Sequence, residues 1–130
     1  MIGGLKEFMD DIPGLSCSFD TGNFIMEHED ELEAFTLFKD KLCTLHLKDR
    51  SKTPPYEDAR GKLCRDGSLE YVAAVGSGYI RIPKILTQLK KMNYSGNIIV
   101  ELYEYSHSHM LEGIRDSVKW TKKMLEQLTD

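Results

Sequence analysis

The chain has 130 residues, 41% of them hydrophobic, which suits one domain with a real core and excludes two domains of ordinary size. Its net charge of -4 argues against non-specific binding to nucleic acids or anionic membranes, which needs clustered Lys and Arg. No apolar run approaches the roughly 20 residues that span a bilayer, and the N-terminus lacks a signal-peptide core. We therefore expect a cytoplasmic protein with a small-molecule partner, and we expect its three cysteines to be buried free thiols.

The first part of the chain predicts a helix, a strand, a second helix and a second strand. Residues 5–12 repeat apolar side chains at helical spacing. Residues 15–20 alternate apolar with small polar side chains, which predicts a strand that ends on Asp20. Residues 32–38 predict a helix, and residues 42–50 alternate again. In this second strand the apolar face carries Cys43, Leu45 and Leu47, and the polar face carries Thr44, His46 and Lys48.

The second part begins with a long loop at residues 51–69, which is rich in Pro and Gly and has room for a short helix. Residues 71–75 predict a third strand, which runs into a Gly-Ser-Gly turn, and Pro83 then opens a helix. Residues 97–104 are typical of a strand buried on both faces. A long helix ends the chain, and its predicted inner stripe is Leu111, Ile114, Val118, Thr121, Leu125 and Leu128.

A helix followed by about four strand-to-helix units predicts an α/β fold with parallel strands. Parallel neighbours need a crossover of a dozen or more residues, and helices of this length supply it. We expect residues 1–130 to form a single domain. An open flavodoxin-like sheet is the main alternative to a barrel.

Three predicted strands end on an ionisable residue: Asp20, His46 and Glu101. The C-terminal ends of parallel strands share one rim, so we expect these side chains to meet. Two carboxylates held near 4 Å repel by about 4 kcal/mol at an effective dielectric near 20, and a divalent cation would remove that repulsion. One imidazole and two carboxylates suit Mn, Zn, Co or Fe, with Mg a further candidate. Alternatively, Asp20 caps a turn, His46 is a hydrogen-bonded core histidine, and Glu101 pairs with an arginine.

The segments FDTGN, LHLKDR, GSGYIRIPKILTQLKKMNYSG and NIIVELYE, in this order, resemble the C-terminal half of the xylose isomerase-like TIM barrels. That family contains sugar isomerases and epimerases, and also endonuclease IV. The resemblance covers residues 14–125 and implies parallel (β/α) units that form about half of a TIM barrel, equivalent to strands 5 to 8. In the family, an aspartate ending strand five, a histidine ending strand six and a glutamate ending strand eight bind a divalent metal. These positions match Asp20, His46 and Glu101.

The resemblance also suggests substrate contacts. The Gly-Ser-Gly turn would end the seventh strand, where TIM barrels often bind phosphate, so Gly76 and Gly78 are candidates. Lys48 and Arg50 could contact substrate oxygens or a phosphate, or they could be solvated charges beside an acidic neighbour. Asn23 stands where many family members have a histidine, and it remains a candidate contact.

The family's fourth metal ligand, a glutamate ending the fourth strand, lies before the region present here. A full barrel takes about 250 residues, so the chain matches about half of one and would leave two sheet edges unpaired. We therefore expect a homodimer, association with a separate N-terminal half, or a chain that is a fragment of a longer gene product.

The resemblance implies a metal-dependent isomerase or epimerase that acts on a sugar or sugar phosphate through an enediolate, with Glu101 as the catalytic base. A non-catalytic remnant that binds a metabolite is the alternative. The phosphodiesterase reaction of endonuclease IV fits less well, because residues 70–75 offer neither aspartate nor histidine and the acidic charge opposes DNA. His107 and His109 could form a second metal pair, although two histidines in a polar loop are more often surface residues.

Overall fold

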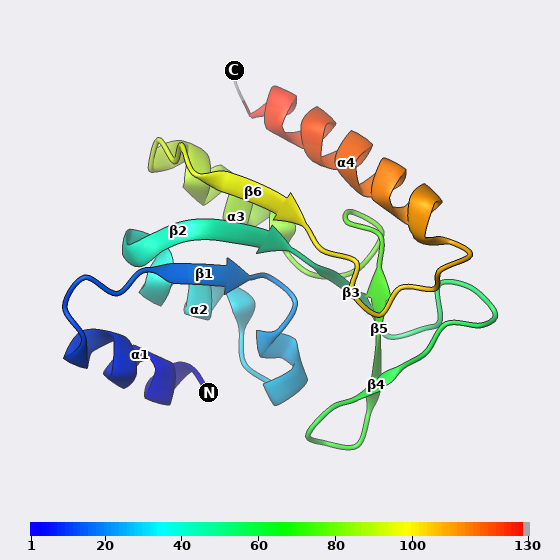
Figure 1. The fold of residues 1–130 in the computed structure, drawn as a ribbon, viewed down its shortest axis with the longest axis horizontal. Coiled ribbons are helices and arrows are strands. Elements are labelled where there is room, and N and C mark those ends of the chain that lie inside the picture. Colours follow the sequence, from blue (N-terminus) through cyan, green and yellow to red (C-terminus); the bar gives the residue numbers. More distant parts are fainter. Residues whose placement is uncertain (129–130) are drawn as a thin grey trace.

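The computed structural model describes residues 1–128, and a three-stranded parallel sheet forms its centre (Figure 1). The strands are β1 (Cys17–Asp20), β2 (Leu42–Leu47) and β6 (Asn97–Val100), in the order β1-β2-β6. Asp20 lies opposite His46, and Leu47 lies opposite Val100. The C-terminal ends of the three strands therefore lie side by side at one edge.

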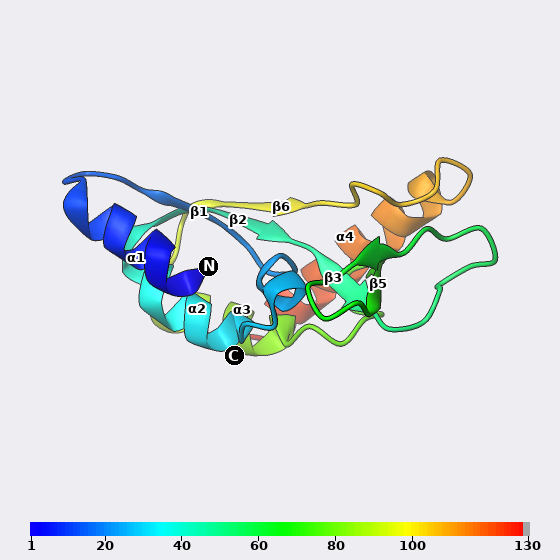
Figure 2. The same ribbon diagram turned by 90° about the horizontal axis from the view of Figure 1, so that it is seen from below.

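A helix follows each parallel strand before the next one begins. These helices are α2 (Glu31–Phe38), α3 (Ile82–Lys91) and α4 (Met110–Gln127), and α1 (Ile2–Asp11) precedes β1. Figure 2 shows α1, α2 and α3 on one face of the parallel sheet, and Figure 1 shows α4 running beyond the β6 edge. The predicted α/β class with parallel units is confirmed. Within residues 1–128, no helix has the length and apolar character needed to cross a membrane.

The starts of two helices follow from local sequence. The Asp30 side chain accepts hydrogen bonds from the backbone N–H groups of Leu32 and Glu33, both at 2.9 Å, and so caps α2. Pro83 lies in the first turn of α3, where the missing N–H has no intrahelical partner to lose. Short 3₁₀ helices at Phe24–Glu27 and Lys39–Lys41 precede and follow α2.

The apolar face of the sheet packs on these helices, as the alternation in β1 and β2 predicts. Phe19, Phe35 and Leu45 are at most 1% exposed, and the Phe19 ring contacts Phe35 edge-on with ring centroids 5.3 Å apart. Cys43 is exposed, so the prediction that it is buried is wrong. A shift in register at the start of the β1–β2 pairing takes Cys43 out of the alternation.

Residues 71–75 do not add a fourth parallel strand, so that prediction is wrong. Strand β5 (Leu69–Ala73) pairs antiparallel with β3 (Asp49–Ser51) and with β4 (Lys62–Leu63), in an insertion between β2 and α3. No helix lies between β3 and β5, and without a crossover the returning chain pairs antiparallel. The loop at residues 52–68 accordingly contains β4, where the sequence left room for a short helix.

Apolar side chains are exposed at the β6 end of the sheet. Among the described residues β6 pairs only with β2, and Ile99 is 43% exposed, so the prediction of a strand buried on both faces is wrong. The predicted inner stripe of α4 is also wrong over its first half, because Leu111, Ile114 and Val118 are exposed. The buried side of α4 carries the small residues Gly113, Ser117 and Thr121, which allow the helix to approach closely. Ser117 accepts a hydrogen bond from the backbone N–H of Val75 at 2.8 Å.

Candidate metal centre

Asp20, His46 and Glu101 meet at the C-terminal edge of the parallel sheet. Asp20 ends β1, His46 is its neighbour on β2, and Glu101 directly follows β6. The backbone N–H of Glu101 donates to the carbonyl of Leu47 at 3.0 Å, which extends the ladder of hydrogen bonds past the end of β6. One potential ligand atom from each of the three side chains lies within 4.8 Å of the others. The structure thus brings together the three residues that the sequence analysis selected.

A lysine side chain lies inside this cluster. Lys48 Nζ is 2.6 Å from Glu101 Oε1, 3.1 Å from Asp20 Oδ2 and 3.3 Å from Asn23 Oδ1. His46 Nδ1–H donates to the other oxygen of Glu101 at 2.9 Å. Glu101 therefore pairs with a lysine and a histidine, not with an arginine. The side chain of Lys48 is only 8% exposed, so the interpretation of Lys48 as a solvated charge is wrong.

The electrostatics of the two carboxylates differ. Burial is the largest influence on Asp20 and raises its pKa above the ordinary value, although Lys48 and the N–H of Gly22 oppose this. Burial also acts to raise the pKa of Glu101, but the hydrogen bonds from Lys48 and His46 prevail and hold that pKa below its usual range. Glu101 is more exposed than Asp20 and closer to Lys48 Nζ, which accounts for the difference.

The donor set fits a divalent metal. Two ionised carboxylates within 4.8 Å repel by about 3.5 kcal/mol or more at an effective dielectric near 20; the single charge of Lys48 offsets part of this repulsion, and a divalent cation would offset more of it. One imidazole nitrogen and two carboxylate oxygens are ligands for Mn, Zn, Co, Fe or Mg. Three protein ligands would leave coordination positions for water or substrate. Asp20 Oδ1 also accepts a hydrogen bond from the Gly22 N–H at 2.8 Å, so the predicted turn cap and the cluster coexist.

The backbone of Lys48 is held firmly by the loop after β1. Thr21 Oγ1 donates to the Lys48 carbonyl at 2.8 Å and accepts from the Lys48 N–H at 2.9 Å. A Cβ atom at Gly22 would lie 2.8 Å from the Lys48 carbonyl oxygen, so only glycine allows this close approach. These contacts fix the position of the Lys48 backbone, from which the side chain extends.

Arg50 is 1% exposed, so it is not a solvated charge. Its Nε donates to the Gly22 carbonyl at 3.1 Å, and its Nη1 forms an ion pair with Glu104 Oε2 at 3.8 Å. The guanidinium thus connects the loop after β1 to the segment after β6. Its burial leaves almost no surface for a substrate.

The glycines of the Gly-Ser-Gly turn are engaged by a residue that the sequence analysis did not select. Asp49 Oδ2 accepts hydrogen bonds from the N–H groups of Gly76 and Gly78 at 2.9 and 3.0 Å. Asp49 Oδ1 accepts from Ile80 and Arg50 at 3.1 and 2.9 Å. The two glycine N–H groups are therefore already bonded to a carboxylate, an arrangement that does not favour phosphate binding there. The signal in the sequence was an acidic residue near the C-terminal end of the predicted strand at residues 42–50.

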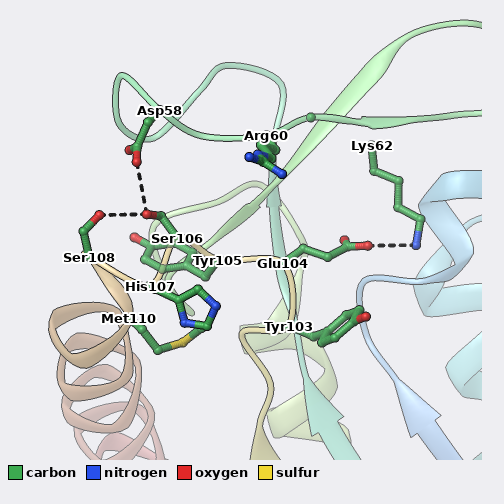
Figure 3. Close-up of a pocket in the computed structure, with 11 residues that line it drawn as sticks. Asp58, Arg60, Lys62, Tyr103, Glu104, Tyr105, Ser106, His107, Ser108 and Met110 are labelled. Atoms are coloured by element: carbon green, nitrogen blue, oxygen red, sulfur yellow. Dashed lines mark hydrogen bonds and ion pairs between the residues drawn. The ribbon is translucent and has the colours of Figure 1, made fainter.

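An open pocket of about 840 Å³ lies beside the chain that leaves β6 (Figure 3). Its lining includes Tyr103, Glu104 and His107, and Figure 3 shows Lys62 pointing toward Glu104, 3.2 Å away. None of the three cluster residues lines this pocket. His109 instead stacks on Tyr56 with ring centroids 4.4 Å apart. Within residues 1–128, no group of three or more potential ligands contains His107 or His109.

The chain is similar to known proteins over nearly its whole length. Residues 2–124 match the family described as xylose isomerase-like TIM barrel. Over 108 residues, or 83% of this chain, it is 29% identical to a Haemophilus influenzae protein provisionally named L-ribulose-5-phosphate 3-epimerase, and the match covers 35% of that protein. A crystal structure of a xylose isomerase domain protein from Planctomyces limnophilus shares the fold with a TM-score of 0.76 and 22% identity.

The match to that structure covers 98% of this chain and 44% of the other. The chain thus spans less than half the length of both relatives. The family match, the parallel strand-to-helix units and the shared fold agree with one another. The chain belongs to the xylose isomerase-like TIM barrel family.

Proposed function

We propose that the chain carries part of the active site of a metal-dependent isomerase or epimerase that acts on a sugar or sugar phosphate. The observation that supports this most is the convergence of Asp20, His46 and Glu101, with ligand atoms within 4.8 Å of one another, on three adjacent parallel strands. The name of the Haemophilus influenzae relative adds a substrate class, a ketose phosphate. In such a substrate the carbonyl lies next to a carbon that carries both a proton and a hydroxyl.

In this proposal Glu101 is the catalytic base. Its lowered pKa keeps it ionised at neutral pH, so it can accept the proton from the carbon beside the carbonyl and generate an enediolate. Asp20 and His46, together with Glu101, would hold the metal. The bound metal would supply positive charge to stabilise the negative charge that develops on the substrate oxygens.

Lys48 and Asn23 are the proposed substrate contacts. Asn23 is exposed at the edge of the cluster, and its Oδ1 accepts from Lys48 Nζ. Both polar groups are thus close to the place where a substrate oxygen would approach Glu101. Arg50, Gly76 and Gly78 make internal contacts instead, and we assign them a supporting role.

Proton exchange between substrate and solvent tests this function without requiring a complete epimerase. In the resembled epimerases a second glutamate, outside the region matched here, returns the proton on the opposite face. With Mn²⁺ and L-ribulose 5-phosphate in D₂O, we therefore expect deuterium to enter at C3 without formation of the 3-epimer, as measured by proton NMR. Glu101→Gln should abolish the exchange, while Glu104→Gln, outside the cluster, should retain it. Exchange that survives in Glu101→Gln would rule out this base.

We also propose that further (β/α) units complete the barrel. The chain supplies three parallel strands, a TIM barrel has eight, and both β1 and β6 have a free edge within the described residues. Two copies would bring only six strands, so an N-terminal half that supplies the remaining five strands fits the barrel better than a homodimer does. The exposed Leu111, Ile114 and Val118 of α4 would then contact that half. Light scattering tests this, since a stable dimer would favour self-association.

A metal-free, metabolite-binding module is the second candidate. The specific observation in its favour is that the ammonium group of Lys48 already pairs with both carboxylates without a metal.

A cytoplasmic location is part of both proposals, and the three free cysteines suit a reducing compartment.

A further inference from the structure

The ammonium group of Lys48 lies at the centre of a set of oxygen atoms. An ammonium group has three N–H donors, and Nζ has three oxygen neighbours within 3.3 Å: one each from Asp20, Glu101 and Asn23. The three oxygens come from the end of β1, the loop after it and the segment after β6, and Lys48 itself follows β2. The Lys48 side chain is therefore a specific part of the cluster and not a surface charge that happens to be close.

The same two carboxylates are potential metal ligands. A divalent ion bound by Asp20 and Glu101 would lie between oxygens that now accept hydrogen bonds from Lys48. Two cations cannot share this space, because like charges at such distances repel strongly. The metal has one partner that the lysine does not use, since the imidazole of His46 bonds to Glu101 and not to Lys48. The second positive charge of the metal and its bond to the imidazole nitrogen, which an ammonium group cannot use as a partner in the same way, give the metal its advantage over Lys48.

The surroundings of Lys48 allow the side chain to move while the backbone stays in place. Thr21 holds both the N–H and the carbonyl of Lys48, and Gly22 packs against the same carbonyl. Exchange of one cation for the other therefore needs only rotation about side-chain bonds. Strands β1 and β2 would keep their register.

We propose that Lys48 is a built-in cation of the metal-free protein, which holds Asp20 and Glu101 together, and that a divalent metal binds by displacing its ammonium group. The inference rests on the metal site of the proposed function and adds a competitor to it. Once displaced, the ammonium group is free to contact a substrate oxygen. Lys48 is in this sense a positioning residue before metal binding and a candidate substrate contact after it.

The reactivity of Lys48 tests the displacement directly in the unaltered chain. The protein is treated with an amine-acylating reagent with and without saturating Mn²⁺, and labelling is followed by peptide mass spectrometry. We expect the labelling rate of Lys48 to rise at least tenfold with Mn²⁺, while that of Lys84, exposed on α3, stays constant. An unchanged rate at Lys48 in protein that has bound Mn²⁺ would overturn the inference and leave the metal site itself intact.

Metal affinity provides the second measurement. Lys48→Met should bind Mn²⁺ at least tenfold more tightly than the unaltered chain in calorimetric titrations, and Lys84→Met, which removes the same charge elsewhere, should not. Asn23→Ala removes one partner of the ammonium group and should tighten binding less, which gives a readout if Lys48→Met fails to fold without metal. Equal or weaker binding by both cluster variants would contradict competition. Absence of binding in every protein would instead reject the metal site, and with it the displacement of the Lys48 ammonium group by a metal.

Discussion

Asp49→Asn is a nearly isosteric change that tests how the Gly-Ser-Gly turn is held. Asp49 is 1% exposed, and its two carboxylate oxygens accept four backbone N–H groups. In asparagine one of these oxygens becomes an NH₂ group, which cannot accept. Whichever orientation the amide adopts, two N–H groups lose their acceptor and face another donor: either the buried pair of Arg50 and Ile80 or the partly buried pair of Gly76 and Gly78.

The size of the effect follows from this count. Each buried donor left without a partner costs about 1–3 kcal/mol, or roughly 2–6 kcal/mol for two. Burial raises the pKa of Asp49 above the ordinary value, although the four hydrogen bonds from N–H groups act to lower it. Burial of the charged carboxylate is therefore unfavourable, and its removal in asparagine offsets part of the lost stability. We therefore expect the free energy of unfolding to fall by about 2–4 kcal/mol, equivalent to a melting temperature roughly 10 °C lower.

Urea denaturation followed by far-ultraviolet circular dichroism measures this loss at pH 7. Asp40→Asn serves as the matched control, because Asp40 is exposed and should change stability by less than about 0.5 kcal/mol. If Asp49→Asn were as stable as that control, the turn would not depend on the carboxylate. In that case the argument that Asp49 already occupies the amides of Gly76 and Gly78 would fail.

Two further predictions concern packing and charge outside the cluster. Burial acts to raise the pKa of Glu31, but hydrogen bonds from Arg81 prevail and hold it below the usual 4.5, so its stabilisation is present above about pH 4.5 and lost as the pH falls. Arg81→Ala should therefore lower the free energy of unfolding by about 2 kcal/mol at pH 7, which is less than for a fully buried pair because Arg81 is 40% exposed. At pH 3 the loss should be smaller than at pH 7. An equal loss in urea denaturation at both pH values would refute this. Gly76 has φ +93°, and a Cβ there would lie 2.3 Å from the Trp120 ring. Gly76→Ala should lower stability by about 2–4 kcal/mol and shift tryptophan fluorescence to longer wavelength, and an unchanged spectrum would contradict the packing.

The sequence predicts the parallel strands and the cluster because both depend on local periodicity. Alternation around Phe19 and Leu45 sets the buried face, and this places Asp20 and His46 on the opposite face. Glu101 follows because its strand ends at the same edge. Alternation also places Lys48 on the polar face with His46, but nothing in the sequence shows that its ammonium group bonds to both carboxylates.

The remaining errors come from contacts between distant segments. An apolar run such as residues 71–75 fits a parallel or an antiparallel strand equally well, and the missing crossover helix decides between them. The α4 stripe at Leu111 and Ile114 has helical periodicity, yet periodicity does not say which neighbour covers it. In this chain Ser117 bonds to Val75 in the insertion, Gly113 lies against Leu102 and Tyr105 after β6, and α4 leaves its larger apolar side chains exposed.

Calorimetric titration of Mn²⁺ into metal-stripped protein tests the central claim most directly. The claim predicts saturable binding near one metal per chain, lost in His46→Ala because the only nitrogen ligand of the cluster is removed. His28→Ala is the matched control, since that histidine pairs with Asp66 and lies outside the cluster. Binding that persists in His46→Ala, or no binding in any of the three proteins, would contradict a metal centre formed by Asp20, His46 and Glu101.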